Sequence, residues 1–247
     1  MISRNTVLLA AGVLISTTEA FAPVAQNSVK NTALDAYKMY YSTSTGNTET
    51  IAGYIAEYAG ISDFEDIGDA TDSDVTGCDG LIVGAPTWHT GADEQRSGTS
   101  WDDWLYDTLP NLDLDGKKVA IFGVGDQQSY GDNFCDAAGE LYDLFSAKGC
   151  KVFGLTSQDG YDHGTFSLFL SLIHCVVCVC ILCPPFFFFI SRNTMLYRFT
   201  KQTPTVESKA VKDGKFCGLM CDEDNQYDMS DDRAKSWVAQ LKDEGFM

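Results

Sequence analysis

The chain has 247 residues, 45% of them hydrophobic, which is enough for one large domain or two small ones with a real core. Its formal net charge of −18 at pH 7 argues against nucleic acid and anionic membrane surfaces as partners and favours a basic protein partner. Solubility is the alternative explanation of that charge. The nine cysteines form no disulfide framework, and their odd number favours a reducing compartment.

Residues 1–32 are typical of targeting sequence. Arg4 precedes an apolar run at 7–15, and small residues follow, which is the layout of a secretory signal. An Ala-Phe-Ala-Pro junction at 20–23 is then followed by a stretch without an acidic residue until Asp35. This resembles the bipartite presequences of algae with complex plastids, in which a transit peptide follows the signal peptide. The resemblance implies location in the plastid stroma, and secretion is the alternative.

From residue 37 onward, patterns typical of strands and helices alternate. Gly60, Pro110 and Gly149 are expected to end three of the helices, and 72–77 is expected to be a connection. This rhythm predicts an α/β fold with a doubly wound, five-stranded parallel sheet covered by helices on both faces, and ligands outside the carboxyl ends of the strands. We expect strands at 37–41, 64–67, 81–83, 118–124 and 151–155, helices at 48–58, 101–109 and 137–148, and a last strand and helix within 216–241.

A hydroxyl-rich turn separates the first strand from the first helix. It consists of Thr43, Ser44, Thr45, Gly46, Asn47 and Thr48. Unpaired N–H groups and the helix dipole make such a turn an anion site. The turn has no lysine, which excludes the nucleotide-binding loop that ends in Gly-Lys and favours a terminal phosphomonoester bound by neutral donors. An ordinary helix cap is the alternative.

Two later loops also follow predicted strands. The first contains Pro86, Thr87, Trp88, His89, Thr90 and Gly91, and the second contains Gly125, Asp126, Tyr130, Asn133 and Phe134. An acidic run at 222–227 precedes the last helix. In this order and spacing, these segments resemble the long-chain flavodoxins, small carriers that hold one FMN. The resemblance covers 37–162 and 207–241.

The resemblance implies a flavodoxin-like fold and a non-covalent FMN site made of the turn at 43–48 and the residues of the two loops. It implies that Trp88 and Tyr130 hold the two ring faces and that Asp126 lies near the N3 edge. The turn at 89–91 would offer a carbonyl to the N5 proton of the singly reduced ring, and Gly91 would ease that peptide rearrangement because glycine tolerates positive φ. Neither a catalytic residue nor a metal site is expected.

The resemblance also implies a function and partners. The chain would be a monomeric, low-potential one-electron carrier that replaces ferredoxin in photosynthetic electron transfer, as under iron limitation. It would dock on basic faces of ferredoxin-NADP reductase and photosystem I. Asp93, Glu94, Asp102 and Asp103 would supply steering charge, unless they are simply a solvated acidic loop. The alternative is an FMN-dependent NAD(P)H:quinone reductase of the same fold.

Residues 164–206 depart from this pattern, because they include no acidic residue in a strongly acidic chain. The apolar run at 166–190 is long enough to span a membrane. A single span, however, would separate 216–241 from the sheet that this segment completes. A membrane-anchored carrier is therefore only the alternative to a soluble protein.

Four cysteines in the same segment have metal-ligand spacing. They are Cys175, Cys178, Cys180 and Cys183. Their neighbours are apolar and offer no donor to orient the sulfurs, so a metal is not favoured. We interpret 164–206 as a translated intron or an apolar insertion that interrupts a domain of residues 33–247. The codons at its borders permit a GT start and an AG end, and its removal restores a loop like that of the family.

Overall fold

The computed structural model of the chain describes residues 37–161 and 207–247. The predicted presequence (1–32) and the interrupting segment (164–206), with its apolar run and cysteine pairs, lie outside these described residues. Across the described ranges, no helix is both long enough and apolar enough to cross a membrane.

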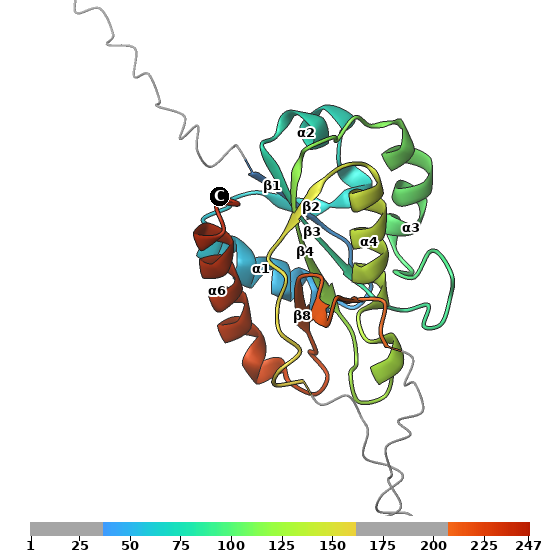
Figure 1. The fold of residues 1–247 in the computed structure, drawn as a ribbon, viewed down its shortest axis with the longest axis vertical. Coiled ribbons are helices and arrows are strands. Elements are labelled where there is room, and N and C mark those ends of the chain that lie inside the picture. Colours follow the sequence, from blue (N-terminus) through green and yellow to red (C-terminus); the bar gives the residue numbers. More distant parts are fainter. Residues whose placement is uncertain (1–36, 162–206) are drawn as a thin grey trace, which may run out of the picture. The chain divides into compact units, whose positions relative to one another are not determined.

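The core of the fold is a parallel sheet in the order β2-β1-β3-β4-β5 (Figure 1). This confirms the predicted five-stranded, doubly wound architecture. The order changes direction between β1 and β3, so the loops that follow these strands diverge and leave a crevice at their carboxyl ends. The strands are β1 (Tyr37–Tyr41), β2 (Phe64–Asp66), β3 (Gly80–Pro86), β4 (Lys118–Val124) and β5 (Lys151–Phe153).

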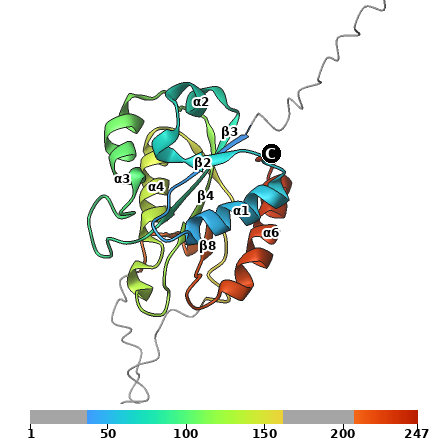
Figure 2. The ribbon, with the colours of Figure 1, turned by 180° about the vertical axis from the view of Figure 1, so that it is seen from behind.

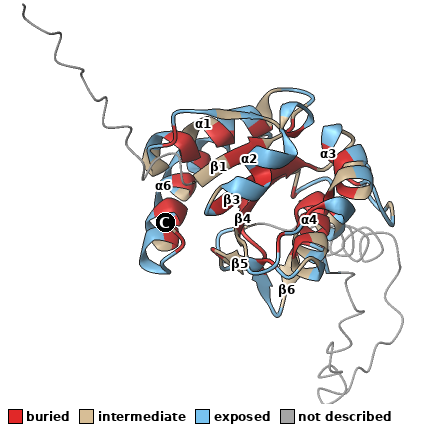
Figure 3. Ribbon diagram, turned by 90° about the horizontal axis from the view of Figure 1, so that it is seen from above, coloured by how far each residue is buried: buried red, intermediate tan, exposed pale blue. Residues whose placement is uncertain are grey.

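Helices cover both faces of the sheet. Helices α1 (Asn47–Ala59) and α6 (Tyr227–Asp243) lie together on one face, and α3 (Ser100–Asp103) and α4 (Asp136–Ala147) lie on the other (Figures 1 and 2). Every residue of β3 is buried, as expected for a strand covered on both sides. In Figure 3 the strands lie between the two helical layers, and exposed residues lie mainly on the outer surfaces of the helices.

The fifth strand is built from two separate pieces of chain. β5 pairs with the first half of β4, and β8 (Leu219–Cys221) pairs in parallel with its second half. The predicted strand 151–155 therefore ends early, because Gly154 has φ of 78° and its carbonyl accepts a hydrogen bond from Trp237 Nε1 at 2.7 Å. A small antiparallel hairpin of β6 (Val211–Lys212) and β7 (Lys215–Phe216) precedes β8.

Two further predictions need correction. The stretch 72–77 is a short helix, α2 (Asp72–Gly77), whose first turn is capped by Thr71 through the amide of Asp74. The predicted helix 101–109 is α3 followed by a π-helical turn, η2 (Trp104–Thr108), and a 3₁₀ turn, η3 (Leu109–Asn111). Pro110 lies in the first turn of η3 instead of stopping the helix, because proline is tolerated where its N–H would have no partner. Two other 3₁₀ turns are η1 (Ile67–Asp69) and η4 (Gly131–Asn133).

Candidate functional site

Loops from four strands converge on a cavity of about 420 Å³ at the carboxyl edge of the sheet. A cavity of similar size, about 460 Å³, lies beside Lys38, Tyr40 and Asp74 and contains none of the predicted site residues. Volume alone therefore does not identify the site, whereas the convergence of predicted loops does. The first cavity is lined by the predicted residues Thr45, Asn47, Pro86, Thr87, Trp88, Thr90, Gly125, Asp126 and Tyr130, together with Val124 and Asp224.

The turn between β1 and α1 leaves a buried hydroxyl group without a partner. Gly46 has φ of 92°, a left-handed conformation that favours glycine, and its N–H donates to Thr43 Oγ1 at 2.9 Å. Thr48 is completely buried at the start of α1, and its Oγ1 has no hydrogen-bond partner within the part of the chain that the structure describes. Such a group is costly unless a ligand oxygen reaches it, so the turn fits an anion such as a phosphate.

Two aromatic side chains line the cavity from separate loops. Trp88 follows β3 and is 51% exposed, and Tyr130 follows β4 and is 52% exposed. Large aromatic side chains are usually more buried than this. Their position on one cavity suits a flat, apolar ligand, which the two rings can contact while excluding water.

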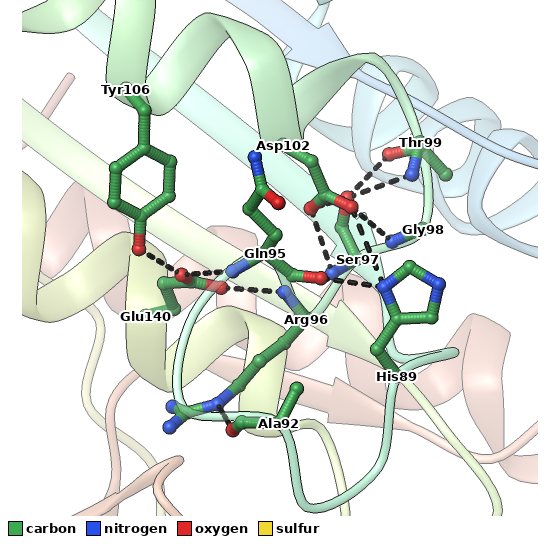
Figure 4. A network of polar contacts seen from close by, with 10 residues as sticks. All are labelled: His89, Ala92, Gln95, Arg96, Ser97, Gly98, Thr99, Asp102, Tyr106 and Glu140. Atoms are coloured by element: carbon green, nitrogen blue, oxygen red, sulfur yellow. Dashed lines mark hydrogen bonds and ion pairs between the residues drawn. The ribbon is translucent and has the colours of Figure 1, made fainter.

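The loop after β3 folds back on itself (Figure 4). The N–H groups of Trp88 and His89 both donate to the carbonyl of Arg96 at 3.1 Å. His89 Nδ1 lies 2.7 Å from the carbonyl of Gln95, so Nδ1 carries the proton in this contact, and the imidazole binds the loop itself. Gly91 has φ of 77°. This is the positive φ that we expected a glycine to tolerate at this position.

The loops after β4 and β8 are joined through carboxylates. Asp126 accepts hydrogen bonds from the amides of Gln128 and Ser129 and from Asn225 Nδ2, each at 2.9 Å. Partial burial opposes ionisation of Asp126, but these hydrogen bonds outweigh it and hold its pKa below the usual value. Asp222 is fully buried and accepts from the N–H of Gln127 at 3.0 Å.

Asp222 and Asn225 were not predicted as site residues from the sequence. The available signal was the acidic run at 222–227, directly after the last strand, which we used only for the family resemblance. In the structure, Asn225 Nδ2 contacts both Asp126 and Asp222, so it joins the two loops.

Some predicted site residues support the loops without lining the cavity. Phe134 is fully buried and its ring packs against Phe216, with centroids 5.9 Å apart, because a large apolar ring is more stable in the core. Asn133 Nδ2 donates to Asp136 at 3.1 Å. The predicted residues that are absent from the cavity lining are Thr43, Ser44, Gly46, Thr48, His89, Gly91, Asn133 and Phe134.

The acidic residues expected to steer a partner divide into two kinds. Asp93, Glu94 and Asp103 are exposed beside the β3–α3 loop. The side chain of Asp102 is only 13% exposed, and its carboxylate accepts hydrogen bonds from the N–H groups of Ser97 and Gly98. Asp102 therefore braces the loop, which corrects its interpretation as a free surface charge.

The described residues contain no group of three or more histidine, cysteine or acidic side chains that could hold a metal ion. Burial raises the pKa of Cys217 and of Cys221 to about 12, so both thiols stay protonated at neutral pH.

Comparison with known proteins identifies similar molecules. The flavodoxin family model matches residues 39–237. The flavodoxin of a Nostoc species is 38% identical over 210 residues, covering 83% of this chain and 95% of the relative. That of Synechococcus elongatus is 37% identical over 211 residues, with the same coverage. The crystal structure of Fusobacterium nucleatum flavodoxin bound to flavin mononucleotide matches with a TM-score of 0.60 and 25% identity, covering 84% of this chain and 97% of that chain.

Proposed function

The chain belongs to the flavodoxin family, whose members are FMN-binding electron carriers, and on that basis we propose that it replaces ferredoxin as a low-potential one-electron carrier in photosynthetic electron transfer. The observation that carries the FMN part of the proposal is the hydroxyl of Thr48 at the start of α1, which has no partner among the described residues. It lies in the same turn as Thr45, which lines a cavity bordered by Trp88 and Tyr130. A phosphate and a flat ring are the two recognition elements of FMN.

The turn at 43–48 holds the phosphate in this proposal. The first N–H groups of α1 and the Thr48 hydroxyl would donate to phosphate oxygens, and the dipole of the 13-residue helix would add to the attraction. Thr45 and Asn47 line the cavity and border the same ligand group. Neutral donors suffice for a single phosphomonoester.

The loops after β3 and β4 hold the ring. Trp88 and Tyr130 would cover its faces and exclude water, and the backbone at 89–91 would border its edge. Bound FMN would supply the one-electron chemistry. Asp126 borders the cavity as a carboxylate fixed by three hydrogen bonds, and negative charge near the ring disfavours the addition of electrons. These features support a low potential.

FMN titration tests the cofactor assignment. We expect the purified chain to bind one equivalent of FMN and to turn yellow, because the turn recognises a terminal phosphate. Riboflavin lacks the phosphate and should bind more weakly. A preference for FAD or riboflavin would contradict the assignment, and rapid oxidation of NADPH by the purified protein alone would favour a quinone reductase.

Docking to a basic partner should depend on salt. Asp93, Glu94 and Asp103 are exposed beside the Trp88 loop, where they can attract a basic face of ferredoxin-NADP reductase or photosystem I. Such attraction is screened beyond about 8 Å at physiological ionic strength. Electron transfer from the reductase should slow as NaCl is raised, and a rate independent of salt would contradict electrostatic docking.

The proposed plastid location depends on residues 1–32, which lie outside the described residues. A fluorescent fusion of residues 1–40 should accumulate in the plastid of an alga with complex plastids. Secretion of the fusion would overturn this part of the proposal.

We also propose that residues 33–247 form the domain and that 164–206 is a translated intron. The described residues on either side of the gap support this, because Tyr161 packs its ring against Phe134 at 5.8 Å and Ser208 Oγ donates to the Phe134 carbonyl at 2.6 Å. Tyr161 and Ser208 thus both contact Phe134, so a short connection could join them if 164–206 were removed. A variant lacking 164–206 should bind one equivalent of FMN and be yellow, and a dominant transcript that includes the segment would refute the intron.

A further inference from the structure

Glu140 is a buried carboxylate on α4, only 5% exposed, and it does not line the cavity. Its Oε1 accepts hydrogen bonds from the N–H of Gln95 at 2.8 Å and from the hydroxyl of Tyr106 at 2.5 Å. Its Oε2 accepts from the N–H of Arg96 at 2.9 Å. No salt bridge found within the described residues includes Glu140. The carboxylate is therefore held mainly by the backbone of the β3–α3 loop (Figure 4).

A short chain of hydrogen bonds leads from Glu140 to Trp88. Glu140 accepts from the N–H of Arg96, and the carbonyl of the same Arg96 accepts from the N–H groups of Trp88 and His89. Gln95 has φ of 57°, which is uncommon for a residue with a side chain, and its N–H is the other backbone donor to Glu140. Glu140 thus stabilises the returning half of the loop in the conformation that holds the Trp88 backbone.

The rest of the loop is braced independently. The guanidinium of Arg96 is buried and donates to the carbonyls of Ala92 at 2.7 Å and Asp93 at 2.8 Å, which closes the tip of the loop. A Cβ added at Gly98 would lie 2.9 Å from Trp88 Cβ, so the backbone there packs directly against Trp88. The loop backbone is therefore fixed although the Trp88 side chain is half exposed.

We propose that Glu140 is a positioning residue that fixes the Trp88 ring and the backbone at 89–91 through Gln95 and Arg96, and thereby sets the potential of the first one-electron couple of bound FMN. The effect on the potential rests on the proposed function, whereas the effect on the loop does not. A site whose backbone already has the ligand-bound conformation needs less reorganisation when the ligand binds, and it holds its groups at fixed distances from that ligand.

The test compares E140Q with D143N in the full chain. E140Q leaves one oxygen and turns an amide N–H₂ toward one of the backbone donors, whereas D143N removes the same charge from an exposed position of the same helix. Hydrogen exchange is measured over 88–97 before FMN is added. We expect E140Q to accelerate exchange about tenfold, equivalent to about 1.4 kcal/mol, and D143N to leave it unchanged.

A second variant separates loop bracing from helix packing. Tyr106→Phe removes the side-chain donor to Glu140 but keeps both backbone donors, so exchange over 88–97 should stay within about twofold of wild type. If E140Q does not fold, Glu140→Asp replaces it, since it keeps the charge but withdraws the oxygens by one methylene, and exchange should again rise. Equal acceleration in Y106F and E140Q would overturn the proposal.

The loaded proteins give the second readout. The midpoint potential of the first one-electron couple should differ between E140Q and D143N, although both lose one negative charge. Equal potentials, or equal exchange in the two variants, would overturn the role of Glu140. A wild-type chain that does not bind FMN would instead overturn the proposed function and leave the exchange result standing.

Discussion

The β1–α1 turn and the β3–α3 loop border the same cavity but differ in whether their buried polar groups have hydrogen-bond partners. In the β3–α3 loop, the side chains of Glu140, Asp102 and Arg96 pair with backbone N–H and C=O groups. In the β1–α1 turn, the Thr48 hydroxyl is buried and unpartnered within the described residues. The polar groups of the loop are hydrogen-bonded by the protein itself, whereas the Thr48 hydroxyl of the turn is available to a ligand.

This difference has an energetic meaning. A buried polar group without a partner costs roughly 1–3 kcal/mol, so the turn lowers the stability of the ligand-free fold and regains that free energy on binding. Hydrogen bonds in the loop are already made before binding and contribute to stability. Removing a polar group should therefore affect binding in the turn and stability in the loop.

The largest expected effect is that of Thr48→Val. The substitution removes the unpartnered hydroxyl, so the free energy of unfolding without FMN should stay the same or rise. FMN affinity should fall about 10- to 100-fold, because a hydrogen bond to a charged group contributes about 1.5–3 kcal/mol. Urea unfolding and fluorescence titration measure the two quantities.

Thr50→Val, in the first turn of α1, is the matched control. Thr50 is exposed and its Oγ1 donates to the carbonyl of Gly46 at 3.1 Å, so FMN affinity should change little. A Thr48→Val variant that loses stability but keeps its FMN affinity would show that the Thr48 hydroxyl stabilises the fold and does not bind the ligand.

Tyr130→Ala should have a smaller effect on the same binding equilibrium. Loss of one exposed aromatic wall should weaken FMN binding by about 1–2 kcal/mol and leave the unfolding free energy nearly unchanged. Tyr227→Ala on α6 is the control, since Tyr227 is 68% exposed and does not line the cavity. An unchanged dissociation constant and visible spectrum for Tyr130→Ala would show that Tyr130 is not a ring contact.

Asp102→Asn tests the braced loop. It replaces one acceptor oxygen in a carboxylate that binds Ser97 and Gly98, so unfolding free energy should fall by about 1 kcal/mol. Asp103→Asn removes the same charge from an exposed neighbour and should instead weaken the salt dependence of electron transfer. If both variants show the same stability and the same salt dependence, Asp102 does not brace the loop.

The smallest effect is a pH dependence from Asp126. Its folded-state pKa is lowered, so its contribution to stability is present above the unfolded pKa of about 4 and is lost as pH falls through the folded value. The stability difference between wild type and Asp126→Asn should therefore shrink on acidification below about pH 4. Unfolding curves at several pH values measure it, and a difference that grows in acid would contradict the sign.

The sequence predicted the elements whose patterns are local. The strands β1 and β4 were predicted at their observed bounds, and α1 to within one residue at each end, because their apolar periodicity and the terminal Gly60 are local signals. The π-helical and 3₁₀ turns after α3 were not predicted. Trp104 there packs against Phe145 from a distant helix, at 6.1 Å, and single-sequence patterns do not encode such contacts.

The residues of the site also divide into those that local sequence patterns predict and those that depend on contacts between distant parts of the chain. The turn and both aromatic residues could be predicted because each lies in a segment that connects a predicted strand to the next helix. The supporting acids could not, since Glu140 and Asp222 act on residues about 45 and 95 positions away in the chain. Phe134 was assigned to the cofactor from its neighbours in sequence, but its ring lies in the core.

The divided fifth strand also has a consequence for chain entropy. β5 and β8 pair with the same strand, so the chain between them must close a loop from Gly154 to Gly218, and 164–206 makes that loop roughly three times longer. Closure entropy grows with the logarithm of loop length, and a threefold increase costs only about 1 kcal/mol. The divided strand can therefore close around the longer chain with a minor loss of stability.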